Sequence, residues 1–227
     1  MLLLGVPLLA VRAEAGPRRP MSSGGPDGLP GMSEKVISGM SMSLDGFITG
    51  PDDTRAHPLG VGGDRLHRWV QEMDDTDAKV LAEMADGVGA VLMGRHSYDV
   101  CEGEGGWGDG GPVGKVPCVV LTHRAPDPAD VVAPDVFTFV TDGIESAVAR
   151  AKEIGAGRDV GVHGATAAQQ ALNAGLLDEI HIMLVPVLLG AGKRLFDHLG
   201  GPVELRRLWT RESPDITHLR FEVLTKH

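Results

Sequence analysis

The chain has 227 residues, of which 42% are hydrophobic and only 4% aromatic, so one domain of ordinary size can build its core from aliphatic side chains. Its 21 Lys and Arg residues are outnumbered by 31 Asp and Glu residues, giving a formal net charge of -10 at pH 7. This balance argues against a nucleic-acid binder, which needs a basic surface, but it permits a small anionic cofactor held by backbone N–H groups and one or two cations.

The first 31 residues differ in composition from the rest of the chain. Residues 2–11 are a short apolar run, residues 13–15 resemble a small-residue cleavage site, and residues 16–31 are rich in Pro, Gly and Ser. A secretory signal peptide normally carries a positive charge before its apolar run, and here none precedes it. We therefore favour a disordered, non-structural extension over residues 1–31 and one folded domain over residues 32–227.

From residue 35 onward, apolar runs typical of strands alternate with helical patterns. Two late segments, 203–210 and 217–224, alternate like half-exposed antiparallel strands. The glycine-rich segment 102–114 predicts a mobile loop around Trp107. The remaining predicted strands are 35–41, 90–93, 116–122, 136–141, 158–163 and 179–187.

Three longer helices are predicted between these strands, in addition to a short one that follows Gly94. The first begins at the N-cap candidates near Asp74 and ends at glycines 87–89. The second is capped by Asp142, has one apolar stripe and stops at Gly155, and the third spans residues 166–174. Interleaved strands and helices predict an α/β fold, a three-layer αβα domain with a mixed, mostly parallel sheet and antiparallel C-terminal strands.

One strand-to-helix turn has the features of an anion site. The strand that ends at His163 passes through Gly164 into Ala165 and Thr166 at the start of a helix. The first N–H groups of a helix are unpaired and lie at the positive end of its dipole, which favours a phosphate. An ordinary tight turn is the alternative, because the three-glycine dinucleotide fingerprint is missing.

Two further turns have a related composition. Gly94, Arg95 and Ser97 follow one strand at the start of a short helix, while Thr122, His123 and Arg124 follow another. A guanidinium offers a fork of donors to a phosphate, although a solvated surface cation is the alternative for each arginine. Ligands of open α/β sheets bind outside the carboxyl ends of the strands, so these turns could converge on one site.

Other chemistries have weaker support. Asp45 could act as an acid or a substrate anchor, but Asp-Gly is also a routine turn pair. Cys101 and Cys118 lack metal-type spacing and form no disulfide framework, which favours a reducing cytoplasm. No metal-ligand histidine spacing and no apolar run of about 18 residues occur, so we expect neither a metal site nor a membrane span.

Five stretches in order give the chain a family resemblance. Over residues 35–225 it resembles the dihydrofolate-reductase-like fold, in the branch of the C-terminal reductase domain of the bifunctional riboflavin-biosynthesis deaminase/reductase. Each stretch is weak alone, and their order over most of the chain makes them specific. The stretches are SLDGFI at 43–48, VLMGRHSY at 91–98, VVLTHR at 119–124, GLLDEI at 175–180 and PVLLGAGKRLF at 186–196.

The resemblance implies an NADPH site and assigns roles to the three turns. It implies that Gly94, Arg95 and Ser97 face the cofactor, that Thr122, His123 and Arg124 surround the adenosine 2′-phosphate, and that Gly164, Ala165 and Thr166 meet the pyrophosphate. Residues 44–48 would belong to a loop that closes over the nicotinamide. The resemblance also implies a homodimer, with the late strands and residues 186–196 near the contact.

One departure from the family concerns His163. Relatives commonly have a Gly-Gly pair where this chain has His163-Gly164, and a side chain restricts the backbone conformations available. A side chain directed into a neighbouring pocket would be tolerated. An anchor for a pyrimidine phosphate, or a folate-type carboxylate, is not evident in the sequence.

Three hypotheses for the function follow. The first is a cytoplasmic, NADPH-dependent reductase that transfers hydride to a C=N or C=O bond of a small heterocyclic or sugar-derived substrate. The second is a stand-alone 5-amino-6-(5-phosphoribosylamino)uracil-type reductase of riboflavin biosynthesis, since the chain lacks a zinc deaminase signature. The third is a non-catalytic, nucleotide-binding dimeric protein.

Overall fold

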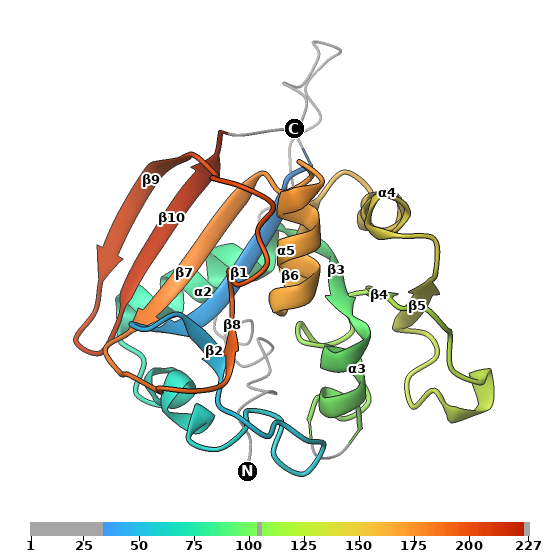
Figure 1. Ribbon diagram of the computed structural model, residues 1–227, viewed down its shortest axis with the longest axis horizontal. Helices are drawn as coiled ribbons and strands as arrows, with labels where there is room; N and C mark the ends of the chain where they lie inside the picture. The colour runs from blue at the N-terminus through green and yellow to red at the C-terminus, as the bar shows by residue number, and fades with distance from the viewer. Residues whose placement is uncertain (1–33, 104–105, 225–227) are drawn as a thin grey trace, which may run out of the picture.

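The computed structural model describes residues 34–103 and 106–224, and the extension predicted over residues 1–31 lies outside them. Eight strands form one sheet in the order β5-β4-β3-β6-β1-β7-β10-β9 (Figure 1). The strands from β5 to β7 are parallel, and β10 and β9 continue the sheet antiparallel. The predicted mixed sheet with antiparallel C-terminal strands is therefore confirmed.

The strands lie close to their predicted positions. The strand predicted over 179–187 ends earlier, at Val185, because Pro186 has no N–H to donate to a sheet. The strands of the main sheet are β1 (Val36–Ser43), β3 (Val88–Gly94), β4 (Cys118–Leu121), β5 (Phe137–Val140), β6 (Asp159–His163), β7 (Glu179–Val185), β9 (Leu205–Glu212) and β10 (Thr217–Val223). Two short strands, β2 (Phe47–Thr49) and β8 (Lys193–Arg194), pair separately.

Helices cover both faces of the sheet, which gives the predicted three layers (Figure 1). On one face α4 (Ile144–Gly155) and α5 (Ala165–Asn173) pack on the central strands. The opposite face is covered by α2 (Asp75–Gly87), α3 (Arg95–Cys101) and the 3-10 segment η1 (Gly63–Val70). A second 3-10 turn, η2 (Pro128–Asp130), lies before β5. Within the described part of the chain, no helix is long and apolar enough to cross a membrane.

The alternation of β3 shows why the layers form. Ala90 and Leu92 belong to the core beneath α4 and α5, whereas Val91 and Met93 belong to the core beneath α3. All four side chains are almost fully buried, because successive strand residues point to opposite covered faces. The continuous apolar run at 90–93 is thus a central strand, as predicted.

One predicted helix cap is wrong. Asp142 does not cap α4: its carboxylate accepts from the Thr141 N–H, and Gly143 is the N-cap with no side-chain bond. At its other end, α4 stops at Gly155, as predicted. Gly155 is the last helical residue, and Ala156 takes the left-handed conformation (φ 51°) that ends α4.

Two other sequence features have a clear structural outcome. Asp74 caps α2 by accepting the Asp77 N–H, as predicted. Trp107, from the glycine-rich segment, is 8% exposed and stacks on Phe137 in the core below α3. The described part of that segment therefore contributes a core side chain.

Candidate functional site

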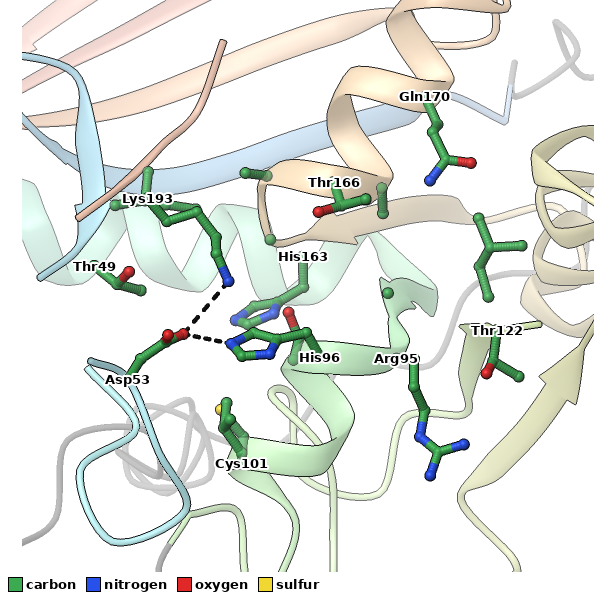
Figure 2. A pocket seen from close by; sticks show the side chains of 18 of the residues that line it. Thr49, Asp53, Arg95, His96, Cys101, Thr122, His163, Thr166, Gln170 and Lys193 are labelled. Carbon is green, nitrogen blue, oxygen red and sulfur yellow. Dashed lines mark hydrogen bonds and ion pairs between the residues drawn. The ribbon is translucent and has the colours of Figure 1, made fainter. Parts of the chain in front are cut away.

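The three predicted turns converge on one cavity. They follow β4, β3 and β6, which are neighbours in the sheet and parallel, so their carboxyl ends open on the same edge. A cavity of about 480 Å³ lies there, a size that suits a small-molecule site (Figure 2). All nine predicted cofactor-binding residues line it: Gly94, Arg95, Ser97, Thr122, His123, Arg124, Gly164, Ala165 and Thr166. We call this part of the cavity the turn end.

The turn at Gly164 leaves helix donors open to the cavity. Gly164 is the N-cap of the nine-residue helix α5, and no side chain caps the helix. Its φ of 87° is one that L side chains rarely adopt, and a Cβ there would lie 2.6 Å from the Ser97 hydroxyl oxygen. The first N–H groups of α5 therefore face the cavity without side-chain competition, which suits a phosphate.

The other two turns are joined by Arg95. Its Nε donates to the Asp99 carboxylate (2.7 Å), and its Nη1 donates to the Arg124 carbonyl (2.8 Å). Thr122 stabilises the same turn, because its hydroxyl also donates to that carbonyl (3.0 Å). The Arg124 side chain is exposed, and within the described residues its guanidinium has no ion-pair partner. Its fork of donors is therefore open to an anion.

His163 does not distort the Gly164 turn. It is the last residue of β6, and among the described non-glycine residues only Asp52 and Ala156 have positive φ. The ring packs edge-on against Trp107, with centroids 5.4 Å apart. Burial, together with nearby His67, lowers the pKa of His163 to about 4, so the ring is neutral at pH 7. The side chain is accommodated in the interior, and the strained conformation falls on the glycine.

Asp45 lies outside the residues that line the cavity. Its carboxylate accepts from the Ser43 hydroxyl (2.6 Å) and from the backbone N–H groups of Leu189 (3.1 Å) and Gly190 (2.7 Å). The hydrogen bond from Ser43, then those from Gly190 and Leu189, lower the pKa of Asp45 to about 2. This geometry favours the turn interpretation over a role as an acid, and a catalytic role stays a prediction.

The opposite part of the cavity is built by residues far apart in the sequence. We call it the loop end, and its polar side chains are Thr49, Asp53, His67, His96, Cys101, His163 and Lys193. Figure 2 shows the Asp53 carboxylate in contact with both Lys193 and His96, and we call these three residues the Asp53 cluster. One oxygen of Asp53 lies 2.6 Å from His96 Nε2 and 3.5 Å from Lys193 Nζ.

Packing fixes the loop end in place. Antiparallel pairing of β2 with β8 brings Lys193 opposite Thr49. Arg55 pairs with Glu102 and donates to the Asp99 carbonyl, which holds the segment 50–62 against α3. Burial raises the pKa of the Cys101 thiol to about 12, and the Asp53 carboxylate adds to the shift. The thiol is thus protonated at neutral pH and is a poor nucleophile.

Sequence reasoning missed the Asp53 cluster. Asp53 lies in a loop with no periodic pattern, and its partner Lys193 is 140 residues away. Only the tertiary pairing of β2 with β8 reveals the contact. In the described ranges, no group of three or more His, Cys, Asp and Glu side chains is placed to hold a metal ion.

The turn end fits the phosphates of a nucleotide cofactor. The fit rests on the uncapped N-terminus of α5, the space kept open by Gly164 and the open guanidinium of Arg124. Fold and site together define an α/β protein whose cavity, at the carboxyl edge of a parallel sheet, offers open hydrogen-bond donors to an anion.

Comparison with known families agrees with this class. The RibD C-terminal domain model matches residues 34–218, and the chain belongs to that family. A protein of Bacillus subtilis (strain 168), the uncharacterized protein YwjB, is 23% identical over 190 residues, which cover 84% of this chain and 98% of YwjB.

Solved structures share the fold at low sequence identity. A Shewanella sp. PV-4 protein assigned to riboflavin biosynthesis is 20% identical, with a TM-score of 0.64 over 85% of this chain and all of that one. A pyrimidine reductase-like protein of Corynebacterium diphtheriae is 12% identical, with a TM-score of 0.55 over 85% of this chain and 93% of its own. The Thermotoga maritima diaminohydroxyphosphoribosylaminopyrimidine deaminase/5-amino-6-(5-phosphoribosylamino)uracil reductase is 16% identical, with a TM-score of 0.55 over 84% of this chain and 56% of its own.

Proposed function

We propose that this protein is an NADPH-dependent reductase that acts on a C=N or C=O bond of a small substrate. The observation that carries the proposal is the convergence of three turns, from neighbouring parallel strands, on one cavity. Membership of the RibD C-terminal domain family supports it. When bound, NADPH supplies the hydride, and the protein supplies binding, orientation and electrostatics.

The turn end offers a donor for each anionic part of the cofactor. The N-terminus of α5 at Gly164, Ala165 and Thr166 would hold the pyrophosphate, because its N–H groups are open. Arg124 would bind the 2′-phosphate through its guanidinium, and Thr122 with Arg95 would keep that turn in place. The loop end is the part of the cavity left for the substrate.

Calorimetric titration with NADPH, and with NADH for comparison, tests the cofactor assignment. We expect NADPH to bind with a micromolar Kd and NADH more weakly, since NADH lacks the 2′-phosphate. Absence of binding by both at sub-millimolar concentration would refute the proposal. Binding without NADPH oxidation across a broad panel of carbonyls and imines would instead favour a non-catalytic nucleotide-binding protein.

A second candidate is the reductase of riboflavin biosynthesis. The family match and the fold shared with the Thermotoga maritima deaminase/reductase favour it. Expression in a riboflavin-requiring strain that lacks this reductase tests it directly. Restored growth supports the assignment, and failure of a well-expressed, folded protein to restore growth argues against it.

We also propose that the protein is a homodimer. The strand β9 forms one outer edge of the sheet, and it exposes Leu205 (41%) and Leu208 (43%). An edge strand with exposed apolar side chains is a surface that a second copy can cover. Light scattering coupled to size-exclusion chromatography measures the mass: a dimer supports the proposal, and a monomer at micromolar concentration contradicts it.

A further inference from the structure

The cluster of Asp53, His96 and Lys193 controls the charge of the loop end. The Asp53 carboxylate is only 16% exposed, and one of its oxygens faces both His96 Nε2 (2.6 Å) and Lys193 Nζ (3.5 Å). The three side chains come from the segment 50–62, from α3 and from β8, and they meet inside the cavity (Figure 2). A buried carboxylate between two nitrogen groups cancels positive charge there.

Within the described residues, no other Lys or Arg supplies positive charge to the loop end. The two remaining cations of the cavity, Arg95 and Arg124, belong to the turn end. The imidazoles of His67 and His163 are neutral at pH 7, because burial lowers the pKa of each to about 4. Lys193 is therefore the one lysine or arginine at this end, and Asp53 neutralises it.

A second, polar groove of about 370 Å³ lies on the other side of Lys193, and it offers no more unpaired cations than the loop end does. Asp52, Asp53 and Asp197 all line it. Its arginine, Arg194, is engaged: the guanidinium lies 4.3 Å from the Phe47 ring centroid and donates to the Asp45 carbonyl. Among the described residues that line this groove, the imidazole of His198 is the one side chain besides Arg194 and Lys193 that can carry positive charge.

We propose that Asp53 is a specificity-determining residue that makes the loop end select an uncharged substrate and exclude phosphate monoesters. The proposal rests on the proposed function, in which the turn end holds the cofactor. A phosphate monoester carries nearly two negative charges at neutral pH and needs unpaired cations or open helix N–H groups. The cofactor phosphates take the helix N–H groups, and the Asp53 carboxylate both repels a second phosphate and occupies Lys193.

The same geometry favours a substrate with hydrogen-bond donors. Both contacts of Asp53 fall on Oδ2, and the described residues give Oδ1 no donor. That oxygen can accept an O–H or N–H from an uncharged carbonyl or imine compound. The apolar side chains of Ile48, Leu59 and Val100 line the same space and suit an uncharged body. A substrate with a phosphoribosyl group does not match this end, so the proposal argues against the riboflavin-biosynthesis reductase given above as the second candidate.

Asp53→Asn tests the proposal, because it keeps the shape of the side chain and frees the charge of Lys193. The probes are ribose 5-phosphate and ribose, titrated calorimetrically into the NADPH-saturated protein. We expect the wild type to bind neither detectably at about 10 mM, and Asp53→Asn to bind ribose 5-phosphate at least about tenfold more tightly than the wild type. Addition of Lys193→Gln to this variant should abolish the gain. Asp53→Ala is the second variant if the first fails to fold.

Asp52→Asn is the matched control. It removes a carboxylate from the neighbouring residue, which has a φ of 57° that Asn readily adopts, and it should leave ribose 5-phosphate binding at the wild-type level. Wild-type binding of ribose 5-phosphate that depends on Lys193 would overturn the proposal. So would a folded Asp53→Asn or Asp53→Ala protein that gains no binding, or an equal gain in Asp52→Asn.

The experiment separates this proposal from the cofactor assignment. If NADPH fails to bind, the proposed function fails, and the series is repeated without cofactor. Without cofactor, ribose 5-phosphate can also bind at the turn end, and that binding does not depend on Lys193. We therefore count only the binding that Lys193→Gln removes. A gain in Asp53→Asn that requires Lys193 supports the charge role of Asp53 even in that case.

Discussion

The turn end and the loop end share one cavity, yet they are built in opposite ways. At the turn end each donor set comes from a short contiguous segment, such as Gly164 with Ala165 and Thr166, placed by one strand and the helix that follows. At the loop end Asp53 meets His96 across 43 positions and Lys193 across 140. Backbone donors thus follow from local geometry, whereas charge compensation depends on how distant segments pack.

The two ends also differ in what they leave unpaired. The turn end presents uncapped helix N–H groups and the Arg124 guanidinium, and these open donors can bind an anion. The loop end pairs Lys193 with Asp53 and holds His67 and His163 neutral. We therefore expect substitutions at the turn end to act on anion binding and those at the loop end to act on charge selectivity or pH.

Among these substitutions, Gly164→Ala should cause the largest loss of NADPH affinity. The added Cβ would lie 2.6 Å from the Ser97 hydroxyl oxygen and would take a φ of 87° that L residues rarely adopt, so Ser97 has to move and the backbone at the N-terminus of α5 is strained. We expect NADPH affinity to fall about 100-fold, or ~2.7 kcal/mol, since several charge-assisted N–H bonds weaken together. Calorimetric titration measures the change.

Gly157→Ala is the control for backbone strain. Gly157 has a nearly identical φ of 85°, but nothing lies within 4 Å of an added Cβ. Both variants place an L residue at a φ that favours glycine, and only the position facing the cavity should alter NADPH binding. Equal losses in the two variants would mean that general destabilisation, rather than the turn end, governs affinity.

Arg124→Ala should have the next largest effect, and it should discriminate between cofactors. Loss of a guanidinium fork on a phosphate costs about 2 kcal/mol, or roughly 30-fold in Kd, and NADH has no phosphate at that position. We expect NADPH to weaken roughly 30-fold and NADH by less than about twofold. Arg150→Ala, on the exposed surface of α4, is the control. Equal losses of affinity for NADPH and NADH would show that Arg124 does not bind the 2′-phosphate.

The same division explains how much the sequence revealed. Gly94, Thr122 and Gly164 could be found because each follows an apolar strand, and parallel strands open on one edge. Asp53 and Lys193 could not be found, because no local pattern links a loop carboxylate to a residue in a two-residue strand. Asp142 was misassigned as a cap because Gly143, which follows it, adopts the N-cap position instead.

Acidification should destabilise the fold in part through the two neutral histidines of the loop end. His67 and His163 have folded pKa values of about 4, below the ordinary 6.5, so the unfolded chain binds more protons between these values. Stability from these rings is complete above pH 6.5 and is lost as the pH falls toward 4, with no further loss below. His163→Leu should reduce the loss between pH 7 and pH 4 by about 1.5 kcal/mol, allowing for solvent contact where the ring borders the cavity. Urea unfolding at several pH values in this range measures the free energy of unfolding of both proteins. If that free energy depends on pH in the same way in His163→Leu and in the wild type, the prediction is wrong.

Asp45→Asn should have the smallest effect on the cavity, and it separates a turn residue from a catalytic one. The carboxylate holds residues 189 and 190 through their N–H groups, so its loss should lower Tm by a few degrees. NADPH affinity should stay within about twofold of the wild type, because Asp45 does not line the cavity. Thr54→Ala, at another loop hydrogen bond, is a control for a general loss of loop order. If Asp45→Asn instead abolishes turnover while Tm and NADPH affinity are unchanged, Asp45 reaches the substrate, and the boundary of the loop end must be extended to include it.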